Sequence, residues 1–187
     1  MDRRKFLATT GVGTAAAALA SPAIAQDTRQ WKMVTAWPKN LPGPGVAAQT
    51  LADRITTLSG GRIEVQLFPA GELVPGRGVF DAVSEGTAEL YHAVPAYWGS
   101  KSKGILLFGS QPFGLRADEQ FGWLYHGGGQ ALYDEMYSRF GIKPFLCGNS
   151  GPQWGGWFRN DINSAEDLKG LKFRTTGLAS EMAAKLG

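Results

Sequence analysis

The sequence predicts an α/β fold with mainly parallel strands, and two observations indicate it. Short runs of apolar and β-branched residues alternate with segments in which apolar residues recur at helical spacing. Stretches rich in glycine and proline separate the two kinds of segment. Strands that alternate with helices form mainly parallel sheets, because each helix returns the chain to the edge where the next strand begins.

The first part of the chain, after a signal-like N-terminus, alternates strands and helices. Its predicted strands are 31–37, 63–67 and 88–94, and its predicted helices are 47–58 and 79–84. In the second strand, Ile63, Val65 and Leu67 alternate with polar residues, as in a strand with one buried face. Gly60 and Gly61 end the first helix.

The rest of the chain continues the alternation. Its predicted helices are 117–126, 130–140 and 178–186, and its predicted strands are 142–147, 154–159 and 171–174. Ser164-Ala165-Glu166-Asp167 has the form of a capping box that opens a further short helix. Gly148-Asn149-Ser150-Gly151 interrupts two predicted strands, so it is either a hinge between domains or a tight loop.

Residues 1–25 have the composition of an export signal. Arg3 and Arg4 precede a run of small and apolar residues, and Ala23-Ile24-Ala25 provides the small residues that a signal peptidase requires. The paired arginines resemble the twin-arginine signal, and an ordinary secretory signal is the alternative. Removal of residues 1–25 leaves 162 residues and lowers the formal net charge from +3 to +1. We therefore expect a periplasmic protein with no nucleic-acid partner, because nucleic-acid binding needs clustered basic residues.

Few residues suggest catalysis or a structural metal. The single cysteine, Cys147, excludes an internal disulfide and is expected to be a buried thiol within an apolar run. His92 and His126 lack metal-ligand spacing to each other and to Cys147. Gly127-Gly128-Gly129 has no Lys-Ser or Lys-Thr behind it, so it does not indicate a phosphate loop.

Gly43, Gly45 and Ala48 match a loose form of the dinucleotide fingerprint between a strand and a helix. The match keeps open an exported NAD(P)-dependent oxidoreductase as an alternative function. Two features argue against it. Residues 38–42 separate the strand from the first glycine, where the fingerprint needs a tight turn, and Glu64 lies in the middle of the next strand, away from a ribose.

Two stretches are candidates for a ligand site. Tyr97 and Trp98 follow the predicted strand 88–94, and ligands of open α/β sheets bind beyond the carboxyl ends of strands. Surface aromatics under a loop are the alternative. Arg174 ends the predicted strand 171–174, where a guanidinium can bind a carboxylate through two parallel hydrogen bonds. A solvated charge or a structural ion pair is the alternative.

Several separate blocks resemble the solute-binding subunits of tripartite ATP-independent periplasmic (TRAP) transporters. The blocks are 80–89, 123–129, 148–159 and 167–174. Gly-Gly-Trp-Phe-Arg at 155–159 is most similar to the branch of the family that binds 2-oxo acids with a cation. The resemblance implies a type II-like periplasmic binding protein, with two α/β domains, a hinge and a ligand cleft. It places domain I at 26–148 and the start of domain II at 149–187.

The resemblance also implies roles for single residues. The arginine matching Arg174 holds the substrate carboxylate, and the glutamine matching Gln153 touches the substrate and a cation such as sodium or calcium. Tyr97 and Asn149 are further candidate ligand contacts. Pro152 and Trp154, beside Gln153, are positions at which the family varies.

As a member of this family, the protein is expected to be no enzyme and to bind no organic cofactor. It would capture a small organic acid, such as the 2-oxo monocarboxylate pyruvate, and deliver it to TRAP membrane subunits. Family chains continue well past the position of Gly187, so we expect a C-terminal truncation that leaves domain II incomplete and the isolated piece poorly stable. A homodimer of the full-length protein would use helices that lie beyond Gly187. A sensor domain with the same fold and no transporter is a further alternative.

Overall fold

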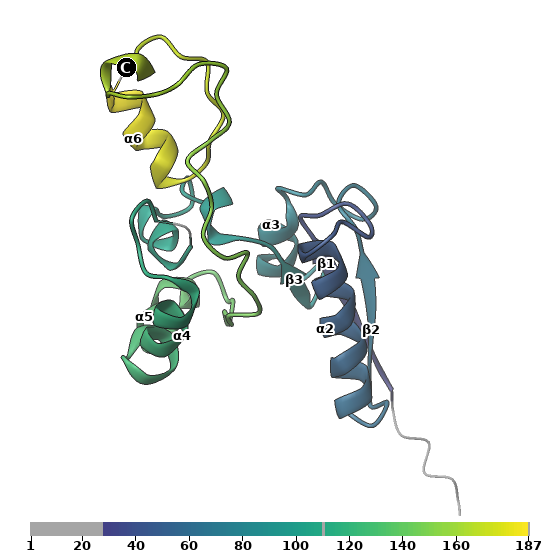
Figure 1. The fold of residues 1–187 in the computed structure, drawn as a ribbon. Coiled ribbons are helices and arrows are strands. Elements are labelled where there is room, and N and C mark those ends of the chain that lie inside the picture. Colours follow the sequence, from purple (N-terminus) through teal and green to yellow (C-terminus); the bar gives the residue numbers. More distant parts are fainter. Residues whose placement is uncertain (1–27, 110, 187) are drawn as a thin grey trace, which may run out of the picture.

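A three-stranded parallel sheet forms the N-terminal part of the structure, a computed structural model that describes residues 28–109 and 111–186 (Figure 1). Strand β1 (Arg29–Thr35) lies between β2 (Ile63–Phe68) and β3 (Leu90–His92), and both pairs are parallel. The predicted α/β class with a parallel sheet is therefore confirmed. The predicted export signal lies outside the described residues.

Both faces of β1 are buried, which explains its nearly continuous apolar sequence. Met33 and Val34 are each 1% exposed and point to opposite faces. Met33 belongs to a cluster with Ala48 and Ala52 of helix α2 (Pro44–Leu58). Two alanines on the buried side of α2 allow a close approach of helix and sheet. Val34 belongs to a second and larger core on the other face.

Phe80, in helix α3 (Val79–Ser84), lies at the centre of that larger core and is 1% exposed. Four aromatic rings surround it, with centroid distances of 6.1 Å to Tyr91, 5.3 Å to Trp98, 5.9 Å to Tyr137 and 5.0 Å to Phe140. The cluster connects α3, β3 and the helical region that follows.

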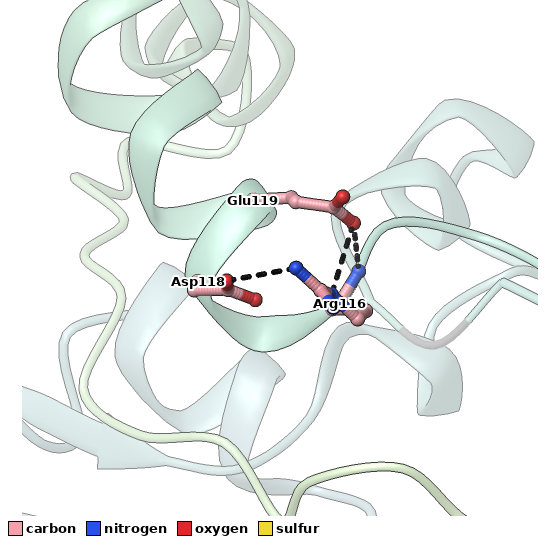
Figure 2. A network of polar contacts seen from close by, with 3 residues as sticks. All are labelled: Arg116, Asp118 and Glu119. Atoms are coloured by element: carbon pink, nitrogen blue, oxygen red, sulfur yellow. Dashed lines mark hydrogen bonds and ion pairs between the residues drawn. The ribbon is translucent and has the colours of Figure 1, made fainter.

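The helical region contains two short 3-10 helices and a helical hairpin. They are η1 (Pro95–Tyr97), η2 (Lys103–Phe108), α4 (Ala117–His126) and α5 (Gly129–Ser138). At the start of α4, the backbone N–H of Arg116 donates to Glu119 at 2.9 Å, and its guanidinium pairs with Asp118 at 3.1 Å (Figure 2). Two carboxylates thus lie near the positive end of the helix dipole. Gly129 allows the hairpin to close tightly, because a Cβ there would lie 2.8 Å from the Trp123 ring.

The chain after α5 departs from the prediction. The predicted strands 142–147, 154–159 and 171–174 are wrong: none of these segments belongs to a sheet in the part of the chain that the structure describes. Pro144 has no N–H for a strand ladder, and its carbonyl accepts from the Gln130 side chain at 2.9 Å.

Two smaller expectations concern this region, and one of them fails. At the predicted capping box, Asp167 accepts the backbone N–H of Ser164 at 2.9 Å, and the short helix that follows is the 3-10 helix η3 (Glu166–Leu168). Cys147 is exposed instead of buried, because the strand expected to carry it does not form. Helix α6 (Leu178–Leu186) follows as predicted. No helix among residues 28–109 and 111–186 combines the length and apolar character needed to cross a membrane.

Replacing Phe80 by alanine should destabilise the full-length protein by about 3–5 kcal/mol, because four rings lose their common neighbour and a cavity remains. Urea denaturation followed by tryptophan fluorescence measures the change. The matched control is Leu107→Ala, since Leu107 is 51% exposed and its loss should change the free energy of unfolding by less than about 0.5 kcal/mol. A loss below about 1 kcal/mol for Phe80→Ala would contradict the assigned core.

Candidate functional site

The carboxyl edge of the sheet carries a cluster of aromatic and polar side chains. Trp37 follows β1, His92 ends β3, and Tyr97 lies in η1 a few residues later. The Trp37 indole Nε1 donates to His92 Nδ1 at 2.8 Å, and the Trp37 and Tyr97 rings lie 6.2 Å apart. Tyr97 is therefore held at the strand ends, where the sequence predicted a ligand contact.

His92 is 7% exposed, and burial lowers its pKa below the ordinary value of 6.5. A lowered pKa means that the neutral imidazole is favoured. Because Nδ1 accepts from Trp37, the proton of the neutral ring lies on Nε2. That Nε2 has no hydrogen-bond partner among the described residues.

A loop before α3 brings Arg77 to the same edge. A Cβ on Gly76 would lie 3.1 Å from the Ala36 carbonyl oxygen and 3.2 Å from the Ala70 Cβ, so only glycine lets the loop approach the end of β1 without displacement. The N–H of Gly78 donates to the Pro75 carbonyl at 2.7 Å, which closes the turn. The Arg77 guanidinium lies over the Tyr97 ring, 5.3 Å from its centroid.

A cavity of about 330 Å³ lies between this edge and the start of α6. Arg77 and Tyr97 line one part of it, and Thr175, Thr176 and Gly177 line another. Figure 1 shows the N-terminal end of α6 beside the teal part of the chain that contains η1 and η2.

Two contacts hold α6 at the cavity. Gly177, at φ 62°, places its Cα where a Cβ would lie 3.3 Å from the Ala96 Cβ. The Lys103 ammonium pairs with the Glu181 carboxylate at 3.1 Å. The residues directly after Arg174 therefore lie against the segment that carries Tyr97.

The segments that carry Gln153 and Arg174 meet through an aromatic contact. The Phe158 and Phe173 rings stack with centroids 5.3 Å apart. A Cβ on Gly156 would lie 2.6 Å from the Phe173 ring, so a side chain there would displace this ring. Side-chain packing, and not a strand ladder, joins the two segments that the sequence singled out.

The four predicted site residues are not gathered into one contact network. Gln153 and Arg174 are exposed and make no hydrogen bond with each other. The Gln153 Nε2 donates to Ser150 Oγ at 2.8 Å, which leaves the amide oxygen free of this contact. Asn149 accepts the backbone N–H of Gly151 at 2.7 Å, which makes the predicted Gly-rich joint an Asx turn. Only Tyr97 lines the cavity.

Gln153 fits a cation site as one ligand among several. Sodium and calcium take oxygen ligands, and calcium takes six to eight of them. Gln153 can offer its amide oxygen. Among residues 28–109 and 111–186, no group of three or more His, Cys, Asp or Glu side chains could hold a metal ion. The other oxygens must come from backbone carbonyls, waters, the ligand or residues beyond this set.

The loose dinucleotide fingerprint does not form a phosphate site. The backbone N–H groups of Gly45 and Val46 both donate to the Leu41 carbonyl, at 3.1 and 3.2 Å, and the N–H of Ala47 donates to Gly43 at 2.8 Å. A phosphate at a helix N-terminus needs such N–H groups to be free. The local loop therefore satisfies the amides that a cofactor would require.

Two residues at this edge were not predicted from the sequence to contribute to a site. Arg77 lies in the stretch Pro75-Gly76-Arg77-Gly78, between a predicted strand and a predicted helix, and Trp37 was predicted only as the end of a strand. The two glycines around Arg77 were the available signal, since they indicate a close backbone approach. The pairing of Trp37 with His92 depends on the strand order and had no local signal.

Comparison with known proteins identifies a family. The sequence model of the bacterial extracellular solute-binding proteins, family 7, matches residues 33–187. A monocarboxylate 2-oxoacid-binding periplasmic protein of Nostoc sp. (strain PCC 7120) is 41% identical over 195 residues, which take in all of this chain and 53% of that protein. The chain therefore spans about half the length of this relative. The predicted resemblance is confirmed.

Two solved structures of TRAP periplasmic solute-binding proteins have the same fold. The protein from Pseudoalteromonas atlantica T6c, with bound sodium and pyruvate, is 40% identical with a TM-score of 0.82; the match covers 86% of this chain and 49% of that one. The protein from Colwellia psychrerythraea, with bound calcium and pyruvate, is 39% identical with a TM-score of 0.83, at 86% and 49% coverage. The predicted binding-protein fold is confirmed, and the comparisons give no support to an oxidoreductase.

Replacing His92 by asparagine should reduce the loss of stability on acidification. Burial lowers the pKa of His92 in the folded protein below 6.5, the value expected in the unfolded chain. The neutral imidazole therefore contributes its full stability above pH 6.5, and this contribution falls as the pH drops below that value. Asparagine keeps an acceptor for the Trp37 indole and does not titrate. Urea denaturation between pH 5 and pH 8 measures how the free energy of unfolding of each variant depends on pH.

The control for this experiment is His126→Asn, because His126 is the other histidine of the chain and is exposed. The control should follow the wild-type profile. An unchanged acid dependence in His92→Asn would show that the imidazole of His92 does not contribute to it.

Proposed function

Since this chain belongs to the bacterial extracellular solute-binding proteins of family 7, we propose that it forms part of the solute-binding subunit of a TRAP transporter. The subunit captures a small organic acid in the periplasm and delivers it to the membrane subunits. The observation that carries the proposal is the match of the family to residues 33–187, together with a cavity at the carboxyl edge of the sheet.

The proposed ligand is a 2-oxo monocarboxylate such as pyruvate, bound together with sodium or calcium. The support comes from relatives: a 41% identical protein is a monocarboxylate 2-oxoacid-binding protein, and two structures at 40% and 39% identity contain pyruvate with sodium or calcium. A cavity of about 330 Å³ has room for an acid of this size.

Arg174 is the proposed carboxylate ligand. A guanidinium presents two parallel N–H groups to a carboxylate, and an exposed arginine has these donors available before the ligand arrives. Thr175, its neighbour in sequence, lines the cavity, which supports a ligand carboxylate at this end.

Gln153, Asn149 and Tyr97 are the proposed further contacts. The Gln153 amide oxygen would serve as a cation ligand, since its Nε2 is already engaged with Ser150. Tyr97 would form an aromatic wall, because it lines the cavity beneath Arg77. The Asn149 amide nitrogen would donate to the ligand, since its oxygen accepts from Gly151.

The two proposed domains meet at the Asx turn of Asn149–Gly151. Domain I would comprise 26–148, with the sheet and the aromatic core, and domain II would begin at 149. Gly151 has φ 74°, a left-handed conformation that favours glycine at a sharp change of direction. Export by the twin-arginine route, through Arg3 and Arg4, is part of the same proposal.

Pyruvate binding by the full-length protein tests the proposal. Isothermal titration calorimetry with pyruvate, in sodium and in calcium buffers, should detect binding, and Arg174→Lys should weaken it about tenfold or more because an ammonium does not reproduce the bidentate contact. The control is Arg62→Lys, since Arg62 is exposed and donates to the Ser59 carbonyl at the α2–β2 turn.

Absence of binding to pyruvate and longer 2-oxo acids under both cation conditions would refute the proposed ligand class. Equal affinity of the wild type and Arg174→Lys would instead remove Arg174 from the site and leave the ligand class standing.

A further inference from the structure

The proposed ligand has two unlike ends, and the cavity offers a place for each. A 2-oxo monocarboxylate carries its charge at one end and an alkyl group at the other. At the start of α6 the cavity is lined by three residues with hydroxyl groups, Thr175, Thr176 and Ser180. Ala96 and Leu106, in η1 and η2, contribute apolar side chains to the lining. The carboxylate therefore has polar neighbours at α6, and the alkyl group has apolar surface on the side of η1 and η2.

Leu106 is held at the cavity by a close contact with Gly99. Leu106 is 3% exposed, and both residues line the cavity. The Cδ1, Cδ2 and Cγ atoms of Leu106 lie 3.0, 3.2 and 3.4 Å from the position that a Cβ on Gly99 would take. The isobutyl group thus lies directly on the backbone of Gly99. Because packed atoms are stiff, it cannot withdraw from the cavity in that direction.

From this packing we infer that Leu106 limits the length of the alkyl group that the site accepts, so that the protein favours short 2-oxo monocarboxylates over longer ones. The inference rests on the proposed function, in which Arg174 holds the carboxylate beside Thr175. With that end fixed, each further carbon of the ligand lies nearer to η1 and η2. A packed wall disfavours additional methylene groups, because they force the surrounding atoms apart.

Leu106→Ala tests the inference with ligands that differ only in chain length. Calorimetry on the full-length protein measures the affinities for pyruvate, 2-oxobutanoate and 2-oxopentanoate. Alanine removes three carbons from the wall, and each methylene group of the ligand that enters this space gains about fourfold in affinity. The ratio of the affinity for 2-oxopentanoate to that for pyruvate should therefore rise about tenfold, while the affinity for pyruvate stays within about threefold.

Gly99→Ala should change the same ratio in the opposite direction. Gly99 does not have a positive φ, so alanine can adopt its backbone conformation. The added methyl group would lie 3.0 Å from Leu106 Cδ1, which is the flexible end of that side chain, and both groups then take space from the cavity. The ratio of the affinity for 2-oxopentanoate to that for pyruvate should fall about threefold or more.

Leu124→Ala is the matched control. Leu124, in α4, is 1% exposed, so its replacement destabilises the core in a comparable way, but it does not line the cavity. This variant should keep the wild-type ratio of affinities. Leu106→Met, which nearly conserves the volume of the side chain, should keep the ratio within about twofold.

The outcomes separate this inference from the proposed function. If pyruvate binds to the wild type and the ratio is unchanged in either folded variant, Leu106→Ala or Gly99→Ala, the inference is wrong and the proposed function stands. The same holds if Leu106→Ala weakens all three ligands equally, since that pattern indicates a structural role. If Leu106→Ala does not fold, Gly99→Ala alone decides. If none of the three ligands binds to the wild type, the proposed function fails and the inference fails with it.

Discussion

The parallel order of the three strands is the constraint on which the rest of the structure depends. Because β1, β2 and β3 run in the same direction, their carboxyl ends lie at one edge, and each return of the chain needs a helix or a long loop. The residues that follow the strands therefore meet although they are far apart in sequence. Trp37 and His92, 55 positions apart, form a hydrogen bond for this reason.

Close contacts at glycines position the loop that carries Arg77, the start of α6 and the segment around Gly156. Gly76 lets the Arg77 loop approach β1, Gly177 lets the start of α6 approach η1, and Gly156 lets its segment cross the Phe173 ring. In each case a Cβ would lie within about 3.3 Å of a neighbouring atom, a distance at which a side chain displaces its surroundings. The same few positions thus determine where Arg77, Tyr97 and Arg174 lie relative to the cavity.

The sequence predicted the elements that local periodicity specifies. Helices α3, α4 and α6 have the predicted bounds, and the three N-terminal strands are displaced by only a few residues. The failures share one cause: a strand exists only if another strand pairs with it, and residues 154–159 and 171–174 have no such partner in the described part of the chain. Tyr97 was predicted because the carboxyl ends of strands are a general ligand position, and it lines the cavity there. Arg77 was not predicted because its place at the cavity depends on the Tyr97 ring, which only the fold brings near.

The exposure of Arg174 decides what ligand capture requires. An ion pair between an exposed arginine and a carboxylate contributes about 0–1 kcal/mol, far less than the roughly 8 kcal/mol of a micromolar complex. A hydrogen bond to a charged group contributes about 1.5–3 kcal/mol when the pair is shielded from water. Arg174 can therefore act as a carboxylate anchor only if the cleft closes over the ligand and removes this water. Closure would bring Arg174 towards an edge of the sheet whose aromatic cluster is already packed, with Tyr97 and Arg77 held on one side. This packed wall lowers the entropy lost on binding, because the Tyr97 side does not have to become ordered.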